Sequence, residues 1–489
     1  MTVSDEPIRR GKPSQPVDHP AALGDLADVF VARNIAVGMT PDGSVVLARP
    51  DSVLVEVPRD AGRRRELQSF LSQRKLRPDN GLVPEPDDGG AGVVAVSIDD
   101  SEPSLRHSER RLSLRSVADV ASDARSAGFG ADLNYVVIGA QVMHGEPLGA
   151  QTSWAGEMAF LANVFTDPVT GQTSLLTTAE PTVQPPAWRD PLDLPDRPRP
   201  RILVLDTGLT TVPADGEVRA AGPVARRAEH ERLQCCEIRK DWKVDADPRI
   251  VDDEDERFDP PVRPLTSGTK PSRSKLLDFE AGHGSFIAGV VLQTCPDADI
   301  VSAGVLSSFG DGDVAGVLST LKRMMDTQGP FDVVVMSFGT NFADDEAAVF
   351  ETELMRLLGP ALGVAAAGNQ NTCRPYFPAA LPGVVGVGAT SAGGKAWFSN
   401  FGGWVDACAP GVDVVSTFFT DFTEVLDGTP TRDYKGWARW SGTSFSAPKV
   451  AAAIAQEMYL FGGTAKDAWK RLSTHKHLRV PDLGVVFNV

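Results

Sequence analysis

The sequence has little cysteine and no long apolar run. Five cysteines occur in 489 residues, an odd number, and only Cys235 and Cys236 are close together. That spacing fits neither a disulfide framework nor a zinc site. No segment reaches the roughly 18 uninterrupted apolar residues of a membrane span, and the N-terminus lacks the apolar stretch of a secretory signal. We therefore expect a soluble protein that is kept reduced in the cytoplasm.

Positive charge is also in deficit. Lys and Arg total 48 against 65 Asp and Glu, which gives a formal net charge of -17. This balance argues against a nucleic-acid binder with one broad basic surface, and we expect neither a nucleic acid nor a membrane as partner. Hydrophobic residues make up 42% of the chain. That fraction supports a sizeable core, and the length allows two or three domains.

The composition predicts four consecutive parts. They are a flexible tail (1–20), a small α+β domain (21–150), a proline-rich linker where processing is expected (151–200) and an α/β domain (201–489). The tail is polar and carries four prolines. The linker ends with seven prolines between positions 181 and 200, which exclude regular helix and central strand and favour an extended connector.

The α+β domain alternates strand-like and helix-like patterns. Apolar residues at three- and four-residue spacing predict helices near 60–75 and 113–127. Short β-branched runs predict strands near 53–57, 92–98 and 134–140. Such alternation within about 100 residues is typical of a small α+β domain.

The last part has the pattern of a doubly wound, mostly parallel sheet with helices on both faces. The runs ILVLDTGL, ADIVSAGVL, FDVVVMSFG, LGVAAAGN and GVVGVGAT are apolar nearly throughout, as expected for strands covered on both faces. Helical patterns lie between them, near 283–294, 313–327 and 344–358. In such sheets, functional groups gather at the carboxyl ends of the strands.

Three residues at strand or helix ends have the side chains of a nucleophile, a base and an orienting acid. Asp206 closes the run ILVLD, and His283 stands between two glycines at the start of an apolar helix. Ser444 precedes an alanine-rich helix, whose N-terminus favours developing negative charge. Each is also consistent with a structural role, since Asp forms turns, Ser caps helices and a lone His often lies in a core.

The blocks DTG, HGSFIAG, AAAGN and SGTSFSAP, in that order, resemble the signature of subtilisin-like serine proteases over roughly residues 201–460. The resemblance implies a subtilisin-like fold and a serine endopeptidase that needs no cofactor for catalysis. It makes Ser444 the nucleophile, His283 the general base and Asp206 the residue that orients the imidazole. Asn369 would form the oxyanion hole together with the Ser444 backbone N–H.

The same resemblance implies where a peptide substrate binds. One group of residues matches the edge strand that pairs with an extended substrate, and a second matches the wall of the primary pocket. The edge strand comprises Ser337, Phe338 and Gly339, and the wall comprises Ala366, Ala367 and Gly368. The small side chains of the wall predict room for a large apolar substrate residue.

The N-terminal domain resembles, in its topology, the propeptides that fold as chaperone and inhibitor of such enzymes. The chain would then be a zymogen inhibited by its own N-terminal domain, with cleavage between about 145 and 200. A permanently attached recognition domain is the other reading. The acidic run at 252–256 is either a surface insertion or a calcium-binding loop, although it lacks the spacing of a defined calcium site.

Two other functional classes compete with the endopeptidase. One is a non-catalytic or conditionally active peptide-binding protein on the same fold. The other is an acid-active sedolisin-like relative, which uses Glu and Asp where this chain has His283 and Asn369. A histidine base predicts activity that rises from acid to neutral pH, because the imidazole must lose its proton.

Overall fold

The computed structural model describes most of the predicted α/β domain and the core of the predicted α+β domain. The described residues are 17–18, 34–39, 45–78, 92–98, 115–139, 164–166, 173–175, 179–209, 211–212, 227–228, 231–233, 237–238, 277, 280–307, 310–342, 348–392, 394–420, 422–426, 429–474 and 478–489. Nearly all of the predicted tail and the acidic run at 252–256 lie outside these ranges.

A long, mostly parallel sheet forms the centre of the larger unit. Its strands follow the order β13 (Glu237–Ile238), β14 (Asp299–Gly304), β10 (Arg201–Asp206), β16 (Val333–Met336), β18 (Leu362–Ala366), β19 (Val384–Ser391), β21 (Ala407–Pro410), β27 (Gly484–Val486) and β26 (Arg479–Val480). Among the described strands of this sheet, only β26 and the short β20 (Gly394–Lys395) pair antiparallel. The predicted doubly wound sheet is thus confirmed, and the chain order reverses at β10.

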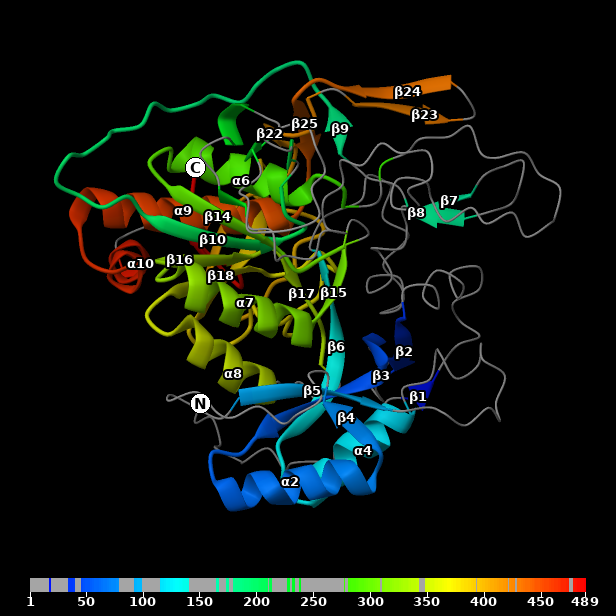
Figure 1. Ribbon diagram of the computed structural model, residues 1–489. Helices are drawn as coiled ribbons and strands as arrows, with labels where there is room; N and C mark the ends of the chain where they lie inside the picture. The colour runs from blue at the N-terminus through cyan, green and yellow to red at the C-terminus, as the bar shows by residue number, and fades with distance from the viewer. Residues whose placement is uncertain are drawn as a thin grey trace, which may run out of the picture.

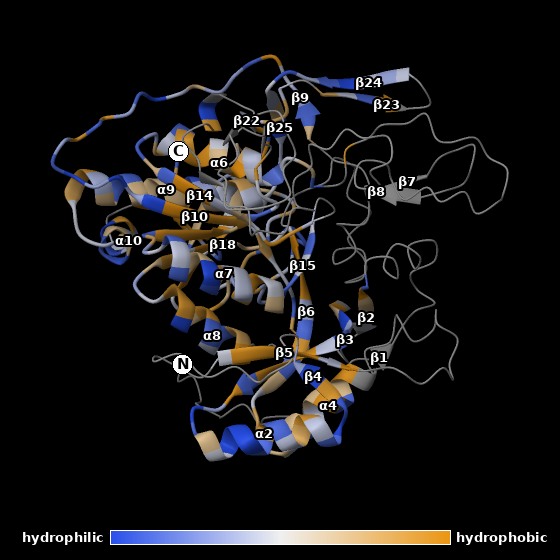
Figure 2. Cartoon of the chain, in the orientation of Figure 1, coloured by the Kyte–Doolittle hydropathy of each residue, from blue (hydrophilic) through white to orange (hydrophobic). Residues whose placement is uncertain are grey.

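Helices cover both faces of this sheet, as predicted (Figure 1). Helices α6 (His283–Thr294) and α9 (Thr443–Phe461) lie on one face, and α7 (Val314–Gln328) and α8 (Ala348–Leu358) lie on the other. Helix α10 (Ala465–Thr474) packs against α9. The strands between these layers are hydrophobic along most of their length (Figure 2), because neither face meets water.

The N-terminal unit is a smaller antiparallel sheet with two helices. Its strands are β1 (Val17–Asp18), β2 (Ala36–Met39), β3 (Val45–Val57), β4 (Leu76–Pro78), β5 (Gly92–Ile98) and β6 (Ala131–Gly139), and its helices are α2 (Ala61–Gln73) and α4 (Arg115–Ser126). Helix α2 begins at Asp60, whose side chain accepts a hydrogen bond from the Arg63 N–H at 2.9 Å. The predicted helices and strands of this unit are confirmed within a few residues, except that β3 extends further towards the N-terminus.

Strand β6 joins the two units. It pairs with β3 in its own sheet and also pairs antiparallel with β15 (Asp311–Asp313) and β17 (Phe338–Gly339) of the larger unit. In Figure 1 it runs out of the small sheet to reach these two strands. Its last residues therefore lie between two segments of the larger unit, and β6 completes a sheet that neither unit forms alone.

The proline-rich segment is extended, as expected, but it lies against the larger unit. From 182 to 200 it contains no helix or strand. The Asp297 carboxylate accepts the N–H groups of Leu192 and Asp193 at 3.0 and 2.8 Å, and the Tyr459 hydroxyl accepts the Leu194 N–H at 2.7 Å. These contacts attach the segment to the protein surface, so at these residues it is not a free tether.

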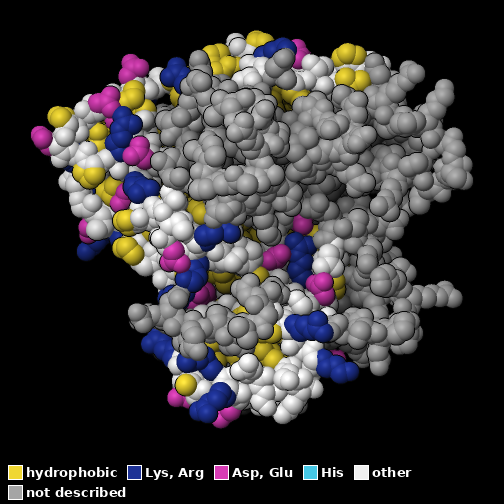
Figure 3. Space-filling view, in the orientation of Figure 1, with side chains coloured by type: hydrophobic (Ala, Val, Ile, Leu, Met, Phe, Trp, Pro, Cys, Tyr) yellow, Lys and Arg dark blue, Asp and Glu magenta, His cyan; other side chains and the backbone are white. Residues whose placement is uncertain are grey.

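The remaining elements are short and peripheral. They are β7 (Val164–Thr166), β8 (Thr173–Leu175), β9 (Glu180–Pro181), β11 (Thr211–Val212), β12 (Arg227–Ala228), η4 (Glu231–Leu233), β22 (Val414–Thr417), β23 (Phe422–Leu426), β24 (Thr429–Tyr434) and β25 (Trp437–Trp440). Within the described ranges, no helix combines the length and apolarity that crossing a bilayer requires. On the face shown in Figure 3, charged side chains are interspersed with small groups of hydrophobic ones over the described surface.

An aromatic cluster connects β25 with the starts of α6 and α9. The ring of Trp440 lies 5.7 Å from Phe286, 5.4 Å from Phe445 and 5.4 Å from His283, measured between centroids. Trp440 is fully buried. Because interiors are close-packed, this indole fixes the distance between the two helix N-termini.

We expect Trp440→Ala to lower the free energy of unfolding by about 3–5 kcal/mol, because it leaves a large cavity in a packed core. Trp397→Ala is the matched control, since Trp397 is 52% exposed, and we expect it to cost under about 1 kcal/mol. Urea unfolding of the full chain followed by circular dichroism measures both. Equal losses for the two variants would contradict the assigned role of Trp440.

Candidate active site

A buried hydrogen bond joins Asp206 and His283. Asp206 is the last residue of β10 and His283 is the first residue of α6. His283 Nδ1 lies 2.8 Å from Asp206 Oδ1, and both side chains are fully buried. The Thr207 N–H donates to the same carboxylate oxygen at 2.8 Å. The acid thus holds the Nδ1 edge of the imidazole and fixes the orientation of the ring.

The position of this pair follows from the strand order. The neighbours of β10 are β14 on one side and β16 on the other, so the carboxyl end of β10 is the switch point where doubly wound sheets form a crevice. Asp206 lies at this end, as expected from the sequence.

The glycines beside His283 allow other parts of the chain to approach closely. A Cβ at Gly284 would lie 2.0 Å from the Gly208 carbonyl oxygen, so only glycine fits there. Gly282 has a φ of +80°, which other residues rarely adopt. The Gly284 N–H donates to Thr207 Oγ1 at 2.9 Å. This close approach brings the start of α6 against the end of β10.

Ser444 is the second residue of α9, whose N-terminus contacts the imidazole through Phe445. Its neighbour Phe445 packs against the His283 ring with 5.3 Å between centroids. The Ser444 hydroxyl donates to the Ser337 carbonyl at 3.1 Å, and the Ser337 hydroxyl donates to the Ser444 carbonyl at 2.9 Å. The hydroxyl is therefore directed at the end of β16 in this state, and His283 Nε2 has no hydrogen-bond partner among the described residues.

Asn369 is fixed on one side and open on the other. Its Oδ1 accepts hydrogen bonds from the Thr443 N–H at 3.0 Å and the Thr443 hydroxyl at 2.9 Å. Its buried Nδ2 has no partner within the described part of the chain. The amide is thus held beside Ser444 with an unused N–H donor, which an oxyanion hole requires.

Glu280 is a site residue that the sequence reasoning missed. It is fully buried, its Oε2 lies 3.7 Å from His283 Nδ1, and neither carboxyl oxygen has a hydrogen-bond partner among the residues described. Burial raises the pKa of Glu280 to about 8. The only signal in the sequence is its position one helical turn before His283.

The His283 imidazole has a shifted pKa. Burial alone would lower it, because a low-dielectric site disfavours the charged ring. The Asp206 carboxylate opposes this with its charge and its hydrogen bond, and Glu280 adds to the effect, so that the pKa of His283 is raised above its ordinary value. The site therefore stabilises the imidazolium form.

Strand β17, which the sequence predicts to pair with a substrate, pairs with β6 in this structure. Phe338 pairs with Gly139, and Gly339 pairs with Ile138. The Gly139 N–H also donates to the Gly310 carbonyl at 3.0 Å. The carboxyl end of β6 thus enters the crevice between β15 and β17, directed along β17 towards Ser337. The predicted pocket wall, made up of Ala366, Ala367 and Gly368, is buried where β18 ends beside Asn369.

Charged and polar side chains secure β6 in this position. Arg49 of β3 lies 3.1 Å from Asp313 and 3.4 Å from Asp311, measured between nitrogen and oxygen. Asn134 and Asp132 of β6 accept backbone N–H groups at the N-termini of α7 and α8, from Ala315 at 3.1 Å and Val349 at 3.3 Å. No sequence pattern pointed to these residues, because each contact joins segments more than 180 positions apart.

A family model described as the subtilase family matches residues 202–483, more than half of the chain. The chain belongs to the subtilase family. The match begins in β10 and extends beyond α9, so it includes Asp206, His283, Asn369 and Ser444. The subtilisin-like fold expected from the sequence is confirmed.

Known subtilases resemble parts of this chain. A cuticle-degrading serine protease of Arthrobotrys oligospora is 33% identical over 195 residues, which is 38% of this chain and 44% of that protein. Alkaline elastase YaB of a Bacillus strain is 28% identical over 210 residues, which is 40% of this chain and 49% of that protein. The chain therefore spans less than half the length of these relatives. The crystal structure of a cold adapted subtilisin-like serine proteinase matches with 22% identity and a TM-score of 0.41, covering 62% of this chain and 95% of that one.

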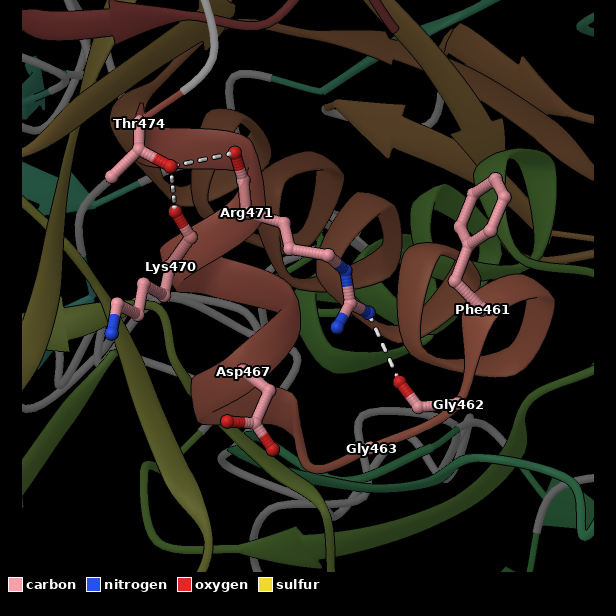
Figure 4. A pocket seen from close by; sticks show the side chains of 7 residues that line it. All are labelled: Phe461, Gly462, Gly463, Asp467, Lys470, Arg471 and Thr474. Carbon is pink, nitrogen blue, oxygen red and sulfur yellow. Dashed lines mark hydrogen bonds between the residues drawn. The ribbon is translucent and has the colours of Figure 1, made fainter.

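The described residues hold no cluster of three or more His, Cys, Asp or Glu side chains placed to bind a metal ion. A hollow between the end of α9 and α10 contains Asp467 and Arg471 (Figure 4). Arg471 donates to Glu457 at 2.8 Å and to the Gly462 carbonyl at 3.0 Å, and Asp467 accepts the Thr464 N–H at 3.0 Å. These charged side chains already form hydrogen bonds at the end of α9 and the start of α10.

We expect the imidazole of His283 to titrate above its ordinary value of 6.5, and Asp206→Asn to lower the midpoint because it removes the charge that favours the imidazolium. Nuclear magnetic resonance of the imidazole in the full chain measures this titration midpoint. The His283 signal is assigned by its absence in His283→Ala. Asp297→Asn is the control, since Asp297 is equally buried but binds the proline-rich segment. An unchanged midpoint in Asp206→Asn would contradict the assigned cause.

Proposed function

We propose that this subtilase is a serine endopeptidase that hydrolyses peptide bonds with Asp206, His283 and Ser444, and that its N-terminal unit inhibits it. The observation that carries the proposal is a pair of buried polar atoms without partners at the N-terminus of α9, the helix that carries Ser444. Within the described residues, His283 Nε2 and Asn369 Nδ2 have none, and both lie beside the N-terminus of α9. Unpaired buried polar atoms are costly and are retained where a ligand or reacting group uses them.

In the proposed reaction, His283 acts as the base. When its Nδ1 carries the proton donated to Asp206, Nε2 has a free lone pair. The Ser444 hydroxyl turns from the Ser337 carbonyl towards Nε2, gives up its proton and attacks the peptide carbonyl. The imidazolium formed is stabilised by Asp206 and then protonates the leaving amine. Water repeats the sequence and releases the acyl group from Ser444.

Asn369 stabilises the negative oxygen of the tetrahedral intermediate. Its Nδ2 and the Ser444 N–H are the proposed donors, and the N-terminal end of α9 adds its dipole. Thr443 holds the amide oxygen with two hydrogen bonds, so the donor nitrogen does not need to be ordered during the reaction. Loss of one such donor typically costs about 2.7–4 kcal/mol of transition-state stabilisation.

We expect a fluorophosphonate probe to label the full chain at Ser444 and to leave Ser444→Ala unlabelled. Ser446→Ala is the matched control and should remain labelled, because the Ser446 hydroxyl donates a hydrogen bond to the Ala409 carbonyl at 2.9 Å. Intact-protein mass spectrometry measures the adduct. Failure to label wild type, even after trimming of the N-terminal unit, would favour the non-catalytic peptide-binding alternative.

The proposed inhibition follows from the position of β6. An extended strand that pairs with both β15 and β17 uses the main-chain hydrogen bonds that a substrate would need. The antiparallel register, continued along β17, leads to Ser337, whose carbonyl accepts the Ser444 hydroxyl. We infer that processing takes place soon after β6. This position precedes residues 145–200, where the sequence predicts cleavage. Most of the first half of that range lies outside the described residues.

We expect Arg49→Ala to weaken the binding of β6 to the larger unit by at least about 2 kcal/mol, because it removes the partly buried ion pairs with Asp311 and Asp313. The rate of fluorophosphonate labelling should rise about 30-fold. Arg74→Ala is the control, since Arg74 pairs with Asp123 at the exposed surface of the same unit. Equal rates for wild type and Arg49→Ala would contradict inhibition by β6. The cytoplasmic location expected from the sequence stays a prediction.

A further inference from the structure

The candidate primary pocket has two walls that end in glycine. Gly339 closes β17, and Gly368 follows β18 directly before Asn369. In the proposed endopeptidase, the side chain of the substrate residue before the cleaved bond enters between these walls. What already occupies that space therefore decides which residues the enzyme accepts there.

The ring of Tyr376 lies against both glycines. A Cβ built at Gly339 would lie 2.3 Å from Tyr376 Cε1 and 2.6 Å from Cδ1, and a Cβ built at Gly368 would lie 2.9 Å from Cδ1. One aromatic ring is thus in contact with both walls. Tyr376 is only 3% exposed, which leaves little open space around it.

The ring is held in this position by its backbone. The next residue, Phe377, forms an antiparallel bridge with Thr340, in which the two N–H groups donate to the opposite carbonyls at 2.9 and 2.8 Å. Thr340 directly follows β17, so the chain at Tyr376 is attached to the substrate strand itself. At the other end, the Tyr376 hydroxyl lies 3.5 Å from the carbonyl oxygen of Ile138 in the seated β6. The side chain therefore extends from the base of the pocket to the bound strand.

We propose that Tyr376 is a specificity-determining residue that closes the primary pocket and restricts the substrate residue before the cleaved bond to glycine, alanine or serine. The inference rests on the proposed endopeptidase function. The small side chains of Ala366 and Ala367 alone predicted room for a large apolar residue. The ring of Tyr376 fills that room, so a larger substrate side chain meets an aromatic face and two glycine walls.

The test uses the full chain, allowed to process itself, and two peptide substrates that differ only in alanine or phenylalanine before the cleaved bond. Fluorophosphonate labelling counts the active sites in each sample. For wild type we expect kcat/KM to favour alanine by at least about a hundredfold. Tyr376→Ala should raise kcat/KM for the phenylalanine substrate by at least about tenfold, because it opens the pocket.

Tyr376→Phe is the matched control, because it keeps the ring and removes only the hydroxyl. We expect it to keep the wild-type preference for alanine, which separates pocket filling from the contact with Ile138. A gain of cleavage cannot result from misfolding, so loss of stability in Tyr376→Ala does not imitate the expected result. Labelled enzyme with equal kcat/KM for both substrates, or with a preference that Tyr376→Ala leaves unchanged, would overturn this inference alone. Absence of labelling in every sample would overturn the proposed function and the inference with it.

Discussion

The antiparallel pairing of β6 with β15 and β17 is the interaction on which the arrangement of the site depends. It brings Gly139 into the crevice next to Glu280 and places Ile138 beside Tyr376. Main-chain pairing of this kind requires little of the side chains, so it positions a strand without selecting its sequence. Selectivity must then come from the few groups beneath the strand.

Glu280 shows how strictly those groups limit the seated strand. A Cβ at Gly139 would lie 1.8 Å from one Glu280 carboxyl oxygen, and a Cβ at Gly310 would lie 2.6 Å from its carboxyl carbon. Glycine on both sides leaves space for the acid, and burial raises its pKa to about 8. Burial thus favours the uncharged form of the acid, which reduces the cost of enclosing it next to Asp206.

Much of the larger unit could be predicted because its signals are local. Apolar runs such as ILVLD and FDVVVM identify buried strands by composition alone, and the polar residue closing each run is placed at the crevice by the parallel topology. Asp206 is identified in this way, whereas Ser337 is identified only through the family resemblance. Arg49, Asp132 and Tyr376 are identified by neither, because their roles depend on contacts between segments far apart in the chain. The three small wall residues alone predict a larger pocket than the one we propose, since the proposed filling side chain comes from outside that segment.

Unpaired polar atoms are concentrated in one place in this protein. Among the described residues, nine buried side-chain polar atoms lack a hydrogen-bond partner, and five of them belong to Asp206, Glu280, His283 and Asn369. Each such atom costs about 1–3 kcal/mol in a fold whose total stability is small. Strand β6 comes close to one of these groups, because Gly139 lies against the Glu280 carboxyl, yet β6 gives none of the five atoms a hydrogen bond. The protein with β6 in place therefore retains the unpaired groups that the proposed reaction uses. They stay available to a substrate strand that replaces β6.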